Sequence, residues 1–400
     1  MKIALVNIAT IVTGDWRDPF ATGDTIIMDN GVIKRVGTAS AQEVESCDLV
    51  VDANGTTACP GLIDSQVHIA FGDYTPKQQA VGFLESYTHG GTTTSISASE
   101  IHVPGRPKDT EGVKALAVCA HKAWENFRPG GMRVHGGAII LEPGLEESDF
   151  VEIHKQGVWL AKAGFGNVKT PFDYVPLVKA AQKAGLVVQV HTGGASISLA
   201  NSIHGKHLIA MQPDVSYHVN GGPIAMPDED FLPVIRETKV ALQICQAGNI
   251  RTALMCLNMA MEHEAFDRFL IATDTPTGTG MMPLGMIKSV TEMSTLSKYP
   301  PEWMLAAATG NVAKVYHLNN GFLREGKDAD VLLVDAPMGG SKTTCLDALK
   351  HGDVWSLVAC FTAGLPRFIG RSRNTPPPLR YPKVAKSKIV NEFSASQQFA

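Results

Sequence analysis

The feature that most constrains the fold is an alternation of short aliphatic runs with helical segments, from about residue 57 to residue 318. Buried strands of a parallel sheet read as continuous aliphatic runs, whereas the helices between them carry apolar residues three and four positions apart. The runs number eight and occupy residues 61–68, 92–97, 133–140, 157–162, 186–191, 214–218, 239–244 and 269–274. Eight strands with intervening helices predict an α/β chain that closes into a (β/α)8 barrel.

Short strands with turn signals precede this region, and another strand follows it. Residues 24–37 read as a hairpin around the Asn30–Gly31 turn. Residues 326–337, GKDADVLLVDAP, form one strand too many for an eight-stranded barrel, so we expect them to join the N-terminal strands. The tail from Ser372 contains three consecutive prolines and little apolar periodicity, and is expected at the surface or against another subunit.

The composition favours a soluble protein with a small-molecule ligand. The formal net charge is -4, from 35 basic and 39 acidic residues without a long block of one sign, so no nucleic-acid footprint is present. The seven cysteines form no CxxC pair, which indicates neither a disulfide framework nor a zinc knuckle. We see no secretory signal and no apolar stretch of membrane-spanning length, and we therefore expect a cytoplasmic protein that does not enter a membrane.

Polar residues end five of the predicted strands, where barrel enzymes carry their catalytic groups. These residues are Gln66 and His68, Lys162, His191, His218 and Asp274. A single histidine is usually structural, but four His and Asp residues at strand ends of one barrel favour a metal site. Imidazole and carboxylate ligands suit zinc and similar divalent ions, which activate water for hydrolysis. Asp274 is then the candidate general base and acid, because it can take a proton from water and return it to a leaving nitrogen.

Several motifs in the same order resemble the amidohydrolase superfamily. They include PGLIDSQVH, HGGTTT, HTGG, HVNGGP, ATDTPTGTGMMPLG and GKDADVLLVD. The resemblance covers nearly the whole chain. It implies a distorted barrel at residues 57–318, a small β-sandwich domain built from both termini (residues 1–56 and 319–371) and a surface tail at 372–400. It also implies a homotetramer.

The resemblance further implies a site for two metals. In that arrangement His68 and Asp274 hold the first metal, His191 and His218 hold the second, and an anion from strand four bridges them. The sequence departs from the pattern at two positions, because Gln66 stands where a histidine ligand is expected and Lys162 stands where a bridging carboxylate is expected. Gln66 offers only a neutral oxygen, so one metal per subunit is as consistent with the sequence as two.

Lys162 can serve the site in two ways. A carboxylated Lys162 supplies the bridging anion, whereas an unmodified ammonium can only take the place of a cation. Zinc is the favoured metal, with iron and manganese as alternatives. Substrate-binding residues stay unassigned. Tyr74, Lys77, His102 and Arg106 lie in loops that can meet an anionic substrate, but an ordinary surface or loop residue is the favoured interpretation for each.

The function implied is hydrolysis of a cyclic amide by metal-activated water, with a carboxylate-bearing ring amide as the substrate class. Two alternatives stay open. One keeps the metal and the fold but changes the bond, to a lactone, a cyclic imide or an N-acyl group. The other is a catalytically silent relative that binds a metabolite or assembles with other subunits, because two expected ligand positions are altered.

Overall fold

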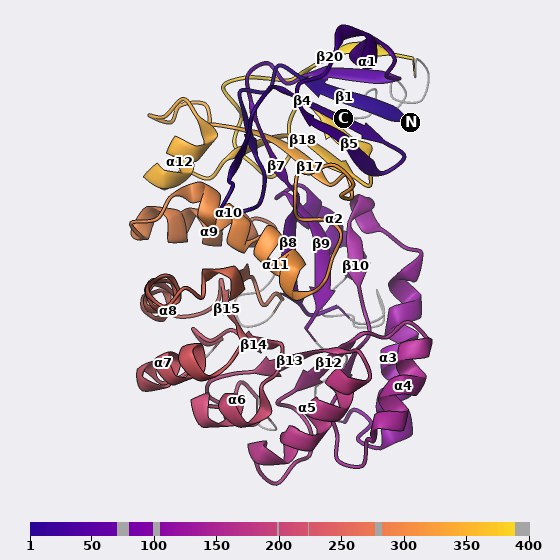
Figure 1. Ribbon diagram of the computed structural model, residues 1–400, viewed down its shortest axis with the longest axis vertical. Coiled ribbons are helices and arrows are strands. Elements are labelled where there is room, and N and C mark those ends of the chain that lie inside the picture. The colour runs from indigo at the N-terminus through magenta and orange to yellow at the C-terminus, as the bar shows by residue number, and fades with distance from the viewer. Residues whose placement is uncertain (70–79, 99–104, 198–199, 223, 277–281, 389–400) are drawn as a thin grey trace.

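The computed structural model describes residues 1–69, 80–98, 105–197, 200–222, 224–276 and 282–388. Figure 1 shows two parts, a strand-and-helix barrel and a layered set of strands from both ends of the chain. Tyr74, Lys77 and His102 lie outside the described residues. Within them, no helix combines the length and the apolar character that a bilayer crossing requires.

The barrel strands follow the predicted aliphatic runs. They are β8 (Leu62–Val67), β9 (Thr92–Ser97), β10 (Arg133–His135), β11 (Ala138–Ile140), β12 (Leu160–Ala163), β13 (Val187–His191), β14 (Val215–Tyr217), β15 (Ala241–Cys245) and β16 (Phe269–Ala272). Neighbouring strands pair in parallel, in the orders β10-β9-β8 and β11-β12-β13-β14-β15-β16. The (β/α)8 architecture predicted from the sequence is therefore confirmed.

The third predicted run is two strands, β10 and β11, separated by Gly136 and Gly137. A Cβ atom at Gly136 would lie 2.5 Å from the Trp124 ring. Gly137 has a φ of +93°, a conformation that side chains rarely adopt. The close approach of the neighbouring helix and this backbone turn interrupt the strand, which distorts the barrel.

Main-chain hydrogen bonds join the last strand to the first. The Asp274 amide donates to the Gln66 carbonyl at 3.0 Å, and the His68 amide donates to the Thr275 carbonyl at 2.8 Å. The Asp64 carboxylate adds to this junction by accepting hydrogen bonds from the Gln66 and Thr273 amides. These contacts bring the ends of β8 and β16 together, although they are about 200 positions apart in the chain.

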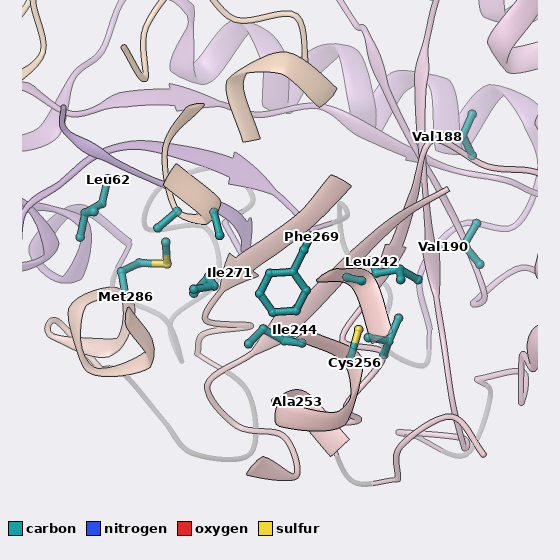
Figure 2. Close-up of a cluster of buried hydrophobic side chains, with 14 of the residues drawn as sticks. Leu62, Val188, Val190, Leu242, Ile244, Ala253, Cys256, Phe269, Ile271 and Met286 are labelled. Atoms are coloured by element: carbon teal, nitrogen blue, oxygen red, sulfur yellow. The ribbon is translucent and has the colours of Figure 1, made fainter. Parts of the chain in front are cut away.

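Helices cover the outside of the barrel. They are α2 (Ala80–Thr88), α3 (Thr110–Glu125), α4 (Glu147–Lys155), α5 (Tyr174–Lys183), α6 (Gly205–Met211), α7 (Asp228–Glu237), α8 (Ile250–Glu262), α9 (Gly285–Leu296), α10 (Pro301–Ala307) and α11 (Gly310–Val315). Figure 2 shows Leu242 and Ile244 of β15 in the same apolar cluster as Ala253 and Cys256 of α8. Because side chains alternate along a strand, Gln243 between them faces the barrel interior.

The remaining strands form two sheets. One has the order β20-β6-β1-β4-β5 and the other β19-β18-β17-β7-β2-β3. The bounds are β1 (Lys2–Val6), β2 (Thr10–Val12), β3 (Phe20–Ala21), β4 (Thr25–Asp29), β5 (Val32–Gly37), β6 (Leu49–Asp52), β7 (Thr57–Pro60), β17 (Val331–Asp335), β18 (Ser356–Thr362), β19 (Leu365–Ile369) and β20 (Lys383–Ser387). Two short helices accompany them, α1 (Ala41–Glu45) and α12 (Cys345–His351).

Buried residues from both sheets, among them Ile3, Met28, Leu333 and Phe361, share one apolar core. Strand β17, which carries the GKDADVLLVD motif, lies between β7 and β18. The tail adds the exposed edge strand β20, which pairs antiparallel with β6. Chain segments from both ends of the sequence therefore lie in the same sheets.

Candidate metal centre

The polar residues that end the strands are all buried at one edge of the barrel. Lys162 lies in β12, His191 ends β13, and His218 directly follows β14. Asp274 follows β16, and the Asp274–Gln66 backbone contact brings it beside the end of β8, which carries Gln66 and precedes His68. The least buried of the six, His68, is only 8% exposed. Parallel strands place their carboxyl ends at the same edge, which explains why these distant positions gather.

His191 and His218 form a pair of imidazoles suited to a common cation. His191 Nδ1 lies 3.2 Å from His218 Nε2. His191 Nε2 lies 2.8 Å from the Gly194 carbonyl, to which it can only donate, so in the neutral ring Nδ1 carries a lone pair. Two imidazole nitrogens on one tetrahedral zinc lie about 3.3 Å apart. Burial lowers the pKa of both rings, that of His218 to about 4, so both are neutral and able to ligate at pH 7.

Lys162 is a candidate for a third ligand, because its charge acts on the pKa of both histidines. Its Nζ lies 3.9 Å from the centre of the Tyr217 ring and 5.7 Å from that of Phe165, and the side chain is only 1% exposed. Burial lowers the pKa of Lys162 to about 7, although the Asp274 carboxylate opposes this effect. A large fraction of neutral amine is therefore present at neutral pH, and this is the form that reacts with carbon dioxide to give a carbamate.

Asp274 accepts two contacts at one oxygen. Gln66 Nε2 donates to Oδ1 at 2.6 Å, and His68 Nε2 lies 3.1 Å from the same atom. Burial raises the pKa of Asp274, but the hydrogen bond from His68 and the charges of His218 and Lys162 lower it to about 2. Asp274 is therefore ionised at neutral pH and can ligate a cation or accept a proton.

The histidine pair supplies two of the three protein ligands that a hydrolytic metal site needs. Within the described ranges, no group of three His, Cys, Asp or Glu side chains gathers as a metal site would. The buried His218 Nδ1 also has no hydrogen-bond partner there. A site with three protein ligands therefore needs Lys162, whose ammonium repels a cation but whose carbamate supplies an anionic oxygen.

Two buried acids near the site were missed by sequence reasoning. Asp64 fixes the junction of the first and last strands and is fully buried, which raises its pKa to about 7. Glu142, also fully buried, pairs with Arg106 and accepts a hydrogen bond from the Asn167 amide at 2.6 Å. Arg106 lies in a loop, as one of the two expected alternatives had it, but it is buried and not on the surface. Its guanidinium is held by Glu142 and by the Phe165 carbonyl, because a loop cation that is buried needs an acidic partner.

A parallel barrel with paired imidazoles, a buried lysine and an aspartate at its strand ends defines a metal-dependent hydrolase. The sequence pattern of the amidohydrolase family matches residues 57–374. The chain belongs to this family, and it is a hydrolase that acts on C–N bonds.

Comparison with known proteins supports this assignment. The chain is 40% identical to the enamidase of Eubacterium barkeri over 384 residues, which are 96% of this chain and 99% of that protein. A crystal structure of enamidase superposes with a TM-score of 0.91 at 39% identity, covering 96% of this chain and 100% of the other. A β-aspartyl dipeptidase from Fervidobacterium islandicum shares the fold, with a TM-score of 0.62 at 18% identity over 92% of this chain and 96% of the other.

Proposed function

We propose that the protein opens a carboxylate-bearing cyclic enamide by hydrolysing the ring amide bond. The observation that carries the proposal is the position of Asp274, ionised and buried at the strand ends that also hold His191, His218 and Lys162. The choice of a cyclic enamide rests on the likeness to enamidase over nearly the full length of both chains. We further propose a cytoplasmic homotetramer, on the same likeness.

The histidine pair and Lys162 hold the cation in this proposal. His191 would bind the cation through Nδ1, His218 through Nε2 and Lys162 through a carbamate oxygen. When bound there, a divalent cation lowers the pKa of water and polarises the substrate carbonyl. Zinc suits a set rich in nitrogen ligands, and iron and manganese are the alternatives.

Asp274 moves the proton in the proposed reaction. It takes a proton from the attacking water, whose oxygen bonds to the carbonyl carbon, and returns the proton to the ring nitrogen as the C–N bond breaks. The products of this step are a carboxylate and an enamine. The enamine tautomerises to an imine, and a second water converts the imine to an aldehyde and ammonia.

Lys162 prepares the site by reacting with carbon dioxide. The neutral amine bonds to the carbon of CO2 and releases one proton, which leaves an anionic carbamate. Burial supplies the neutral amine by lowering the pKa of Lys162 to about 7. Metal and bicarbonate added together should therefore restore activity to stripped protein faster than metal alone.

The test is hydrolysis of a small panel of substrates, measured as loss of each substrate by chromatography, with ammonia release measured in addition. The panel contains 6-oxo-1,4,5,6-tetrahydronicotinate, a saturated lactam, a lactone, a cyclic imide and an acyclic N-acyl compound. We expect ammonia and an aldehyde from the enamide, with loss of activity on removal of metal. Preference for the lactone, imide or N-acyl compound would mean that the enzyme hydrolyses that bond and not the ring amide of an enamide. Absence of turnover on the whole panel by metal-loaded protein contradicts the proposal and favours a binding protein.

A further inference from the structure

The first-strand residue Gln66 belongs to a chain of side-chain hydrogen bonds that crosses the barrel. Its Nε2 donates to Asp274 Oδ1 at 2.6 Å, and its Oε1 accepts from Gln243 Nε2 at 2.6 Å. Gln243 Oε1 in turn accepts from the Ser65 hydroxyl at 2.7 Å. All four side chains are buried, with Asp274 the most exposed at 5%. The chain Ser65–Gln243–Gln66–Asp274 therefore has partners for each amide oxygen and for one of the two N–H donors of each amide.

Chemistry fixes the direction of the Gln66 amide. An ionised carboxylate only accepts hydrogen bonds, so the group that faces Asp274 must be the NH2 of Gln66 rather than its oxygen. The oxygen then faces Gln243, whose own NH2 donates to it. Gln66 therefore presents a donor to Asp274, whereas a metal ligand has to present a lone pair.

The distance between Gln66 and Asp274 also argues against a shared cation. Two ligand atoms about 2.1 Å from one metal and separated by the observed 2.6 Å subtend about 75° at that metal, far below the tetrahedral angle. The same distance is ordinary for a hydrogen bond to a carboxylate. The geometry at Gln66 does not fit the first metal of a two-metal site.

We infer that Gln66 is a positioning residue that takes the place of the first metal, and that the protein works with a single metal at His191 and His218. Gln66, oriented by Gln243 and Ser65, holds Asp274 in place through a hydrogen bond. The inference rests on the proposed hydrolase function. It adds Gln243 and Ser65, residues without any expected role at the site, to the groups that orient Asp274.

Metal content gives the first test and separates this inference from the proposed function. We expect purified protein, saturated with zinc and passed through a desalting column, to retain one zinc per subunit by mass spectrometry. Two retained zinc ions overturn the inference and leave the proposed function standing. Protein that retains no zinc and has no activity contradicts the proposed function, and the single-metal site with it.

Gln243→Met gives the second test, with Gln189→Met as the matched control. Both glutamines are fully buried on the inner face of a barrel strand, but Gln189 bonds to Tyr316 and not to the chain that ends at Asp274. Gln243→Met removes the donor that orients Gln66. We expect a fall in kcat of about tenfold with KM and zinc content unchanged. Gln189→Met should keep kcat within about twofold of the parent protein.

The two variants are read together. Equal kcat in Gln243→Met and Gln189→Met overturns the positioning role. A loss of zinc from Gln243→Met overturns it as well, because zinc loss means that Gln66 was held as a ligand. If Gln243→Met does not fold, Ser65→Ala removes the next donor in the chain with less loss of volume. We expect the same split between kcat and KM in Ser65→Ala, with a smaller fall in kcat, and an unchanged kcat there overturns the role.

Discussion

Replacing Lys162 by methionine should stabilise the metal-free protein while destroying its ability to bind metal. Burial lowers the pKa of Lys162 from 10.5 to about 7, after the attraction of Asp274 is included. One pKa unit corresponds to about 1.4 kcal/mol, so the folded state disfavours the ammonium by about 5 kcal/mol. Methionine has a similar length and no charge, and it avoids this cost in the same space.

The pH dependence has a definite sign. Because the folded-state pKa is the lower of the two, the unfolded chain binds more protons between pH 7 and 10.5, and stability of the wild type rises with pH in that window. The advantage of Lys162→Met should therefore be about 5 kcal/mol at pH 6, about 2 kcal/mol at pH 9, and absent near pH 10.5.

The assay is urea unfolding of chelator-treated protein in buffer free of carbon dioxide, at pH 6 and pH 9, with zinc content measured separately. Lys155→Met, at an exposed position of α4, is the control and should change stability little at either pH. Equal stability of the wild type and Lys162→Met at pH 6 would refute the reasoning, because the lysine would then be solvated or paired. Full zinc retention by Lys162→Met would remove Lys162 from the ligand set.

Four further predictions concern the residues of the site. Asp274→Asn should keep the fold and much of the metal but lower kcat about 100-fold or more, since an amide cannot accept the proton, and near-native turnover would exclude Asp274 from the reaction. His191→Ala and His218→Ala should each abolish tight zinc binding, measured by mass spectrometry after desalting, and undiminished zinc content would exclude that histidine as a ligand. Gln66→His should raise the zinc content from about one toward two per subunit if strand four supplies an anion, and an unchanged zinc content would contradict this role of Gln66. Lys162→Glu should keep zinc bound because glutamate supplies a carboxylate directly, and loss of zinc would contradict the role of Lys162 as an anionic ligand.

The barrel was predictable because its signal is local. Most of the strands are buried on both faces, so stretches such as FLIA at residues 269–272 are continuously apolar and stand out from the helices between them. The break in the third run was not foreseen, since it depends on how closely the Trp124 ring approaches Gly136. That approach is a property of the packed helix and strand, and neither segment shows it alone.

The residues of the candidate site likewise fall into those that a local pattern predicts and those that it does not. His191, His218 and Asp274 could be singled out because each follows an apolar run directly. Gln243 could not, since its partner Gln66 is 177 positions away and its own run reads as an ordinary buried strand. Asp64 is similar, because its main contacts are to Thr273, 209 positions away. Residues that orient a site can be recognised only from their contacts across the barrel. A local sequence pattern does not show these contacts.

The two departures from the family pattern, Gln66 and Lys162, are linked by charge. A buried cluster resists a net charge, because removing an uncompensated ion from water costs several kcal/mol. With a single divalent cation, the carboxylate of Asp274 and a carbamate on Lys162 give exact balance, whereas a second cation leaves two positive charges uncompensated. Without metal and below its pKa of about 7, the ammonium of Lys162 balances Asp274 alone.

Below pH 7 both states of the site are therefore neutral, and the change from the metal-free to the metal-bound state releases a number of protons that can be measured. Starting from the ammonium, carbamate formation and metal binding together release two protons, and starting from the neutral amine they release one. With the pKa of Lys162 near 7, proton release measured by calorimetry in buffers of different ionisation enthalpy, and corrected for the conversion of carbon dioxide to bicarbonate, should fall from about two toward one between pH 6 and pH 8. Release that does not change across this range would show that Lys162 keeps one protonation state, and the coupling of metal binding to the lysine would be wrong.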